Sequence, residues 1–318
     1  MLIKTAFQLF SPASDRGKLS ILIFHRALSA PDSLFSEESD AVRFNLIMSW
    51  VVQQFDVLPL DEAIRLLQAS KLPARAMAVT FNDDYADNYT EALLILQRHS
   101  LPATFFIATN FLDGERMWND TIIEAVRGTK VDFLEADIPG VEAAPMRNDA
   151  EKHSFLGRLI QAIKRQLYSR RRSNALLKSA KRICQRSHAQ HKTAARSAPD
   201  RHADRRTHAQ SPDSGQNRVT EVGHESAASR DILENLLGEP VRRFISSNGK
   251  LGSNYARRDV DIVKRLGFEA AVSMSWEANT RNANPLQPLR FTPWEKQHWR
   301  YSARLLGNLQ HTQVLALE

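Results

Sequence analysis

The stretch "AMAVTFNDDYADNYTEALLILQR", residues 76–98, decides how the rest of the chain is interpreted. An apolar run ends at Phe81, and a leucine-rich run with helical spacing follows a few residues later. Between the two runs stand Asn82, Asp83 and Asp84. A buried strand followed by a helix places this acidic turn at the carboxyl end of the strand, where β/α folds bind their ligands.

Strand-like and helix-like segments alternate on both sides of the acidic turn, and this alternation predicts parallel β/α units. The first half contains predicted strands at 19–24 and 103–108. A helix is predicted at 44–55, with Phe44, Ile47, Val51 and Phe55 on one face. Two more helices are predicted, one that has Asp61 as N-cap and runs to Leu67 and one that ends at Arg98. The last third contains predicted helices at 229–237 and 259–266 and predicted strands at 241–245 and 268–273.

Composition sets limits on the class of protein. The 318 residues are 42% hydrophobic, which is enough for a sizeable core. The single cysteine, Cys184, excludes an intramolecular disulfide framework and a multi-cysteine zinc site. No run of eighteen apolar residues occurs, and the N-terminal apolar patch is too short for a signal sequence. We therefore expect no membrane span and a cytoplasmic location.

The positive charge is concentrated in one tract. Residues 164–218 carry 15 Lys or Arg and 3 Asp, so this tract has a balance of +12 within a chain of net charge +7. From 185 to 218 there is no Val, Ile, Leu, Met, Phe, Tyr or Trp. We expect this part to be disordered because it can bury almost nothing. It also lacks aromatic residues that stack on bases, so we expect no nucleic-acid partner.

Two interpretations of the acidic turn follow from its residues alone. One Asp of a pair can hold a metal ion while its neighbour takes a proton from the attacking water. Alternatively, Asp83, Asp84 and Asp87 only stabilise the N-terminus of the following helix through its dipole.

The stretch from Ala78 to Asp120 resembles the NodB-type polysaccharide deacetylase family, whose first motif is T-F-D-D-G-Y. The segments "ILIFHRAL", "LPLDEAIRLL", "SRDILENLLGEPVRRF", "SNGK", "GFEAAVS" and "LRFTPW" resemble, in the same order, parts of the variant found at bacterial exopolysaccharide loci. The resemblance covers roughly 19–135 and 219–306.

This resemblance implies a single domain over 1–318 that forms a deformed (β/α) barrel. It also implies a divalent metal, often zinc, and hydrolysis of N-acetyl or O-acetyl groups on a polysaccharide or oligosaccharide substrate. Asp83 matches the metal-ligating Asp of the family, and Asn82 stands at the position of its general base. An amide cannot accept the proton of a water molecule, so the general base is missing. Asp84 replaces the glycine of the motif.

The family's two metal-ligating histidines are also missing. Counting back from the helix that contains Ser229 assigns their positions to Thr207 and Ser211, neither of which is a plausible zinc ligand. Permitted codons for residues 202–218, read one nucleotide later, encode M-Q-I-G-A-H-T-H-S-H-P-I-L-A-R-I, with histidines at those two positions. We hypothesise that 185–218 is translated out of frame between two compensating shifts, either in the gene or in the sequence as recorded.

Three further residues are candidates for the site. His25 ends a predicted strand and either approaches the active face or is an ordinary histidine whose hydrogen bonds are satisfied within the protein. Trp276 and Trp294 either stack on sugar rings or pack in the interior. The chain is therefore either a deacetylase impaired in the sequence as written, or a noncatalytic carbohydrate-binding relic or pseudogene product.

Overall fold

The computed structural model describes residues 2–83, 85–109, 112, 117–136, 138–168, 219–241, 243–245, 261–262, 264–268, 270–274, 278–283, 288–291 and 295–311. The chain divides into two compact units. Unit 1 comprises 1–31, 37–109 and 203–318, and unit 2 comprises 32–36 and 110–202. The assignment of the whole chain to one domain stays a prediction.

The strand that precedes the acidic turn, β3 (Ala76–Phe81), is central in unit 1 and is buried along its whole length. It pairs in parallel with β1 (Ser20–Phe24), which is also buried throughout. On its other side β3 pairs in parallel with two short strands, β2 (Asp56–Val57) at its start and β4 (Thr104–Phe105) at its end. Because all these strands are parallel, their carboxyl ends meet at one edge of the sheet.

The C-terminal strands of unit 1 are also parallel. They are β7 (Arg243–Ile245), β8 (Ala270–Met274) and β9 (Leu289–Arg290), paired in that order. A parallel bridge between Leu22 and Phe291 joins β9 to β1 on the side opposite β3. The prediction of parallel β/α units is confirmed, although the strands in the described ranges do not close a complete ring.

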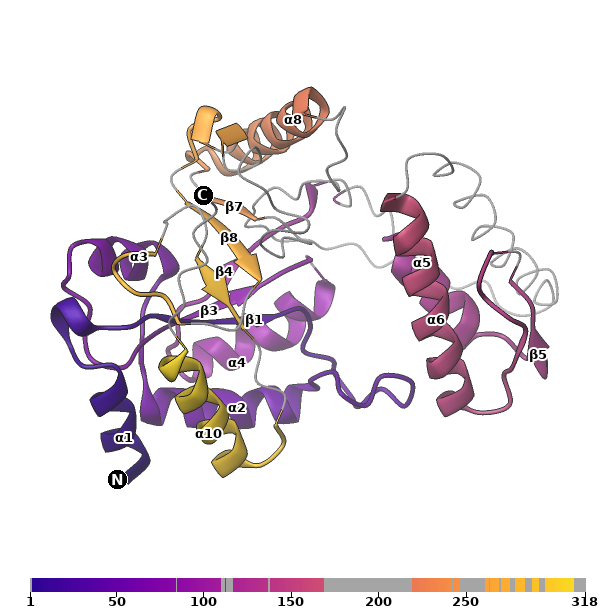
Figure 1. Ribbon diagram of the computed structural model, residues 1–318, viewed down its shortest axis with the longest axis horizontal. Helices are drawn as coiled ribbons and strands as arrows, with labels where there is room; N and C mark the ends of the chain where they lie inside the picture. Colours follow the sequence, from indigo (N-terminus) through magenta and orange to yellow (C-terminus); the bar gives the residue numbers. More distant parts are fainter. Residues whose placement is uncertain are drawn as a thin grey trace. The chain divides into compact units, whose positions relative to one another are not determined.

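Helices cover the strands of unit 1, and α2, α4 and α10 lie along the same side of β1 and β3 (Figure 1). The aromatic rings of Phe24, Phe44 and Phe81 pack edge to face or stacked between α2 and these strands. The helical segments of the unit are α1 (Leu2–Phe10), η1 (Ser14–Arg16), α2 (Ala41–Gln54), α3 (Leu60–Gln68), the π-helical turn η2 (Asn88–Ala92), α4 (Leu93–Arg98), α8 (Val219–Leu237) and α10 (His298–Gln310).

Several predicted element boundaries are wrong by a few residues. Helix α2 begins before Phe44 because Asp40 is its N-cap and accepts a hydrogen bond from the Arg43 amide at 2.7 Å. Asp61 is not the N-cap of α3, since the helix begins at Leu60 after Pro59 and Asp61 lies in its first turn. The strand predicted at 103–108 pairs with β3 over Thr104–Phe105 alone.

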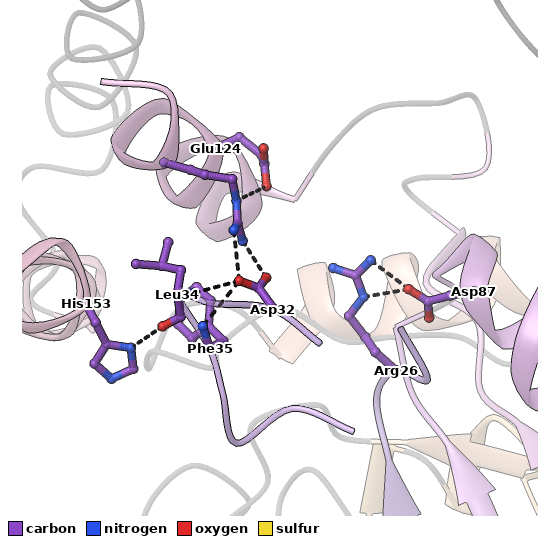
Figure 2. A network of polar contacts seen from close by, with 8 residues as sticks. Arg26, Asp32, Leu34, Phe35, Asp87, Glu124 and His153 are labelled. Carbon is purple, nitrogen blue, oxygen red and sulfur yellow. Dashed lines mark hydrogen bonds and ion pairs between the residues drawn. The ribbon is translucent and has the colours of Figure 1, made fainter. Parts of the chain in front are cut away.

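The described part of unit 2 contains two helices and a short antiparallel hairpin, whose side chains form a separate apolar core around Phe155 and Leu159. Residues 32–36 are anchored in this unit, where Asp32 accepts two hydrogen bonds from the Arg127 guanidinium at 2.9 and 2.7 Å (Figure 2). The elements are α5 (Trp118–Arg127), β5 (Phe133–Leu134), β6 (Ala144–Pro145) and α6 (Asp149–Tyr168).

The predicted disordered tract at 185–218 lies outside the described residues. Within those residues, no helix is long and apolar enough to cross a bilayer.

Candidate functional site

The position of Asn82 is set by the strands on either side of β3. The backbone amide of Asn82 donates to the Phe24 carbonyl at 2.9 Å, and the Phe81 carbonyl accepts from the backbone amide of Phe106 at 2.8 Å. The chain is therefore held to its neighbours up to the last residue of the strand and one residue beyond it. Asn82 is 2% exposed, so its side chain lies within the protein rather than in solvent.

Arg290 is the main partner of the Asn82 side chain. Its Nη1 donates to Asn82 Oδ1 at 2.8 Å and lies 3.4 Å from the Thr80 hydroxyl. Arg290 reaches these residues from β9, on the far side of β1, and its guanidinium carbon lies 5.4 Å from the centre of the Phe106 ring. The bonds between Phe291 and the backbone of Ile21 and Ile23, at 3.0 and 3.1 Å, fix β9 there.

The charge of Arg290 is poorly compensated. The residue is 1% exposed, and its Nε and Nη2 find no hydrogen-bond partner within the described part of the chain. Burial lowers the pKa of the guanidinium to about 9, and the charge of Asp83 acts in the opposite direction. A buried arginine thus meets a neutral amide at the position where the family resemblance implies a carboxylate.

The sequence interpretation did not single out Arg290. The available signal was an arginine in "LRFTPW" between Leu289 and Phe291, because a charged residue flanked by large apolar residues is seldom buried without a partner. The bridge between β1 and β9 and the hydrogen bond to Asn82 place this arginine beside the acidic turn.

Asp83 has a strained backbone and a partly exposed side chain. Its φ is 70°, in the left-handed region that non-glycine residues seldom adopt, although Asp tolerates it better than most. Its carboxylate is 19% exposed, and Oδ2 lies 3.9 Å from Nε2 of His25, whose side chain is 42% exposed. Of the two interpretations of His25, the structure therefore favours the one in which it approaches the acidic turn.

Asp87 connects the acidic turn to the loop after β1. Its Oδ2 lies 2.8 Å from Nε and 2.6 Å from Nη2 of Arg26 (Figure 2). Its Oδ1 accepts from the Ala27 backbone amide at 3.3 Å. The Arg26 guanidinium also lies over the Tyr85 ring, 4.3 Å from its centre. Asp87 makes no side-chain capping bond to η2, so its contacts join two loops at the carboxyl edge.

The described residues do not fit a tightly held divalent metal. Within them, no three His, Cys, Asp or Glu side chains come close enough to share an ion. Asp83 and His25 approach each other, but the oxygen of Asn82 is already occupied by Arg290. The other predicted positions, Asp84, Thr207, Ser211, Trp276 and Trp294, lie outside the described residues.

The sequence around the acidic turn is similar to that of known proteins. The family model described as polysaccharide deacetylase matches residues 69–132, which include β3 and the acidic turn. This part of the chain is therefore similar in sequence to the polysaccharide deacetylase family. The chain is also 32% identical over 92 residues to YxkH of Bacillus subtilis (strain 168), a protein classed by name with the polysaccharide deacetylases. That match spans 28% of this chain and about a third of YxkH, 32% of its length.

Solved deacetylase structures share the fold over nearly the whole chain. PplD, a deacetylase of Streptococcus pyogenes solved with acetate, matches with a TM-score of 0.54 at 15% identity, over 92% of this chain and 98% of PplD. IcaB from Ammonifex degensii matches with a TM-score of 0.51 at 15% identity, over 91% and 97% of the two chains. The expected deformed barrel of the polysaccharide deacetylase type is confirmed as the fold.

Proposed function

We propose that this chain descends from an enzyme that hydrolysed acetyl groups on a bacterial exopolysaccharide with the help of a divalent metal, and that the chain as encoded performs this reaction very slowly. The observation that carries the proposal is the hydrogen bond from Arg290 Nη1 to Asn82 Oδ1 at 2.8 Å. Because of this bond, the Asn82 side chain, which stands at the position of the family's general base, is held in a structural contact.

The chemistry of the amide supports slow turnover. Deprotonating the attacking water requires a group that can accept a proton, and the Asn82 amide does not do so near neutral pH. Loss of general-base catalysis typically costs a factor of about 10² to 10⁴ in rate. The strained Asp83 and the nearby His25 are retained at the turn, so the site keeps part of its architecture without this group.

The donor set supports weak metal binding. A catalytic zinc site usually takes three protein ligands, and the described residues offer Asp83 and His25. The buried positive charge of Arg290 also makes it less favourable to bind a cation beside Asp83, because the two positive charges repel. We therefore assign no catalytic step to a metal in this chain.

The proposal includes the partner and the location expected from the sequence. The substrate class is an acetylated polysaccharide or oligosaccharide, nucleic acid is not a partner, and the location is the cytoplasm. The sugar and the acetyl linkage are left open because Trp276 and Trp294, the two candidates for sugar stacking, lie outside the described residues.

The test compares the chain with a restored version that carries Asn82→Asp and the 185–218 segment encoded in the alternative frame. We expect acetate release from an acetylated oligosaccharide to rise at least about 100-fold on restoration, since the general base returns. Zinc titration by calorimetry should show tight binding in the restored protein alone. Rapid acetate release or tight zinc binding by the unrestored chain would contradict the proposal.

Sequencing the coding DNA across codons 180–222 tests the frame hypothesis separately. In-frame codons whose shifted reading lacks histidines at the positions of Thr207 and Ser211 would reject it.

A further inference from the structure

Four helices of unit 1 share one apolar core. The inner sides of α1, α2, α4 and α10 all contribute side chains to the cluster that contains the aromatic rings of β1 and β3. Helix α2 contacts α10 through Trp50, whose ring centre lies 5.0 Å from that of His298. It contacts the end of α4 through Asn45, whose Oδ1 lies 3.0 Å from Nε2 of His99. The outer sides of these helices therefore face away from a common core and neighbour one another (Figure 1).

Large apolar side chains lie on these outer sides. In α2, Val42 stands nine residues before the buried Val51, which is half a turn out of phase, so Val42 points away from the core and is 79% exposed. Trp299 in α10 is 62% exposed. We call the outer sides of the four helices the helical surface. Its exposed large apolar residues are Leu9, Phe10, Val42, Leu46, Val52, Leu94 and Trp299.

The charge on these helices is positive. Their sequences contain no Asp or Glu, and their basic residues are Lys4, Arg43, Arg98, Arg300 and Arg304. Acidic residues stand next to the helices rather than in them. Asp40 caps α2, Glu295 pairs with Arg304, and Glu91 lies in the π-helical turn before α4. The helical surface thus combines apolar side chains with cations.

This combination narrows the kind of partner. Grouped exposed apolar residues mark a surface that binds something. A second copy of this chain would bring the same positive charges together, which opposes association. A bilayer with anionic headgroups both attracts the cations and takes apolar side chains into the boundary between headgroups and acyl chains. The Arg300 guanidinium lies 5.1 Å from the centre of the Trp299 ring, and tryptophan is the residue type enriched at membrane–water interfaces.

We propose that the helical surface docks on a bilayer that contains anionic lipids. The contact is peripheral, since no helix in the described ranges is long and apolar enough to span the bilayer. Val42, Leu46 and Trp299 enter the boundary region, while Lys4 and Arg300 bind lipid phosphates. The proposal does not depend on the acidic turn or on any catalytic activity of the chain.

The first experiment is flotation of the full chain with vesicles of phosphatidylcholine alone and of phosphatidylcholine mixed with phosphatidylglycerol. We expect binding to the anionic vesicles to be at least about tenfold tighter, because several cations face the bilayer. No binding to the anionic vesicles would overturn the proposal. Residues 164–218 carry a balance of +12 and also attract anionic lipid, so the next comparison keeps this tract unchanged.

The second experiment uses the double variant Val42→Ser with Leu46→Ser. Both side chains are exposed, so the fold should be retained, and circular dichroism checks this. Affinity for the anionic vesicles should fall at least about tenfold because two apolar side chains no longer enter the bilayer. Phe133→Ser in β5 of unit 2 is the matched control, since Phe133 is 65% exposed but lies outside the helical surface. An unchanged affinity of the double variant, or an equal fall with Phe133→Ser, would reject the helical surface as the docking site.

Two measurements on the unmutated chain do not depend on how variants fold. Raising the salt concentration from about 0.1 to about 0.5 M should weaken vesicle binding without abolishing it, because salt screens charges but not apolar contacts. Complete loss of binding would show that charge alone holds the chain and would overturn the proposal. Sedimentation velocity without lipid should show no self-association. A dimer that the double variant abolishes would identify a second copy as the occupant instead of the bilayer.

Discussion

Two arginines of this protein show what a carboxylate partner does for a buried cation. Arg290 in unit 1 is 1% exposed and donates to the neutral amide of Asn82. Arg127 in unit 2 has a side chain that is 35% exposed and binds both carboxylate oxygens of Asp32. The more deeply buried charge therefore has the weaker partner.

The pKa values of the two arginines shift in opposite directions. Burial lowers the pKa of Arg290 to about 9. The hydrogen bond to Asp32 raises the pKa of Arg127, and the same contact lowers the pKa of Asp32 to about 2. Each charge of the unit 2 pair stabilises the other, whereas the unit 1 contact leaves a buried charge to be stabilised by a dipole. The comparison shows that the ion pair in unit 2 stabilises both of its charges, whereas the contact in unit 1 gives a buried arginine a neutral partner.

The largest effect is expected from removing the dipole that faces Arg290. Asn82→Leu deletes the oxygen acceptor and leaves the guanidinium buried without it, so the free energy of unfolding should fall by about 2–3 kcal/mol. Urea unfolding followed by circular dichroism measures the change. Asn119→Leu in α5 is the control and should cost less than about 0.5 kcal/mol. Equal losses in the two variants would show that the Asn82 contact with Arg290 is unimportant for stability.

An intermediate effect is expected from the anchor in unit 2. Asp32→Asn should lower the free energy of unfolding at neutral pH by about 1–2 kcal/mol, less than the full pKa shift implies because Arg127 remains partly exposed to solvent. Glu124→Gln is a matched control, since Glu124 contacts the same arginine at 3.1 Å but is 48% exposed. It should cost less than about 0.5 kcal/mol. A larger loss with Glu124→Gln would reverse the assignment of the anchor.

The same pair predicts how stability depends on pH. The pKa of Asp32 is lower in the folded protein than in the unfolded chain, where it is about 3.9. Its contribution is therefore present above about pH 4 and is lost as the pH falls through 4 towards 2. Urea midpoints measured over this range should converge for the unmutated protein and Asp32→Asn. Parallel curves would contradict the assignment.

The smallest effect is expected from the contact between the two loops at the carboxyl edge. Asp87→Asn weakens the pair with Arg26, whose side chain is 38% exposed, so the cost to stability should be about 0.5–1 kcal/mol. Hydrogen exchange should quicken at the Ala27 amide, which donates to Asp87. Unchanged exchange at Ala27 would indicate that Asp87 does not hold the loop after β1.

Much of the fold was predictable because local signals and burial agree. The apolar runs at 20–24 and 76–81 became β1 and β3, and the helical spacing of Phe44, Ile47 and Val51 became the buried face of α2. Boundaries were less predictable. Pro59 moved the start of α3 ahead of Asp61, and strand pairing limited β4 to two residues.

The site was predictable only in part, for a physical reason. The acidic turn, the amide at position 82 and the neighbouring Asp83 are properties of adjacent residues, so the sequence by itself determined them. The contact of Arg290 with Asn82 joins residues 208 positions apart, and the approach of His25 to Asp83 depends on the register of β1 against β3. Only the tertiary structure decided these contacts, because parallel pairing brings together strand ends that no local spacing relates.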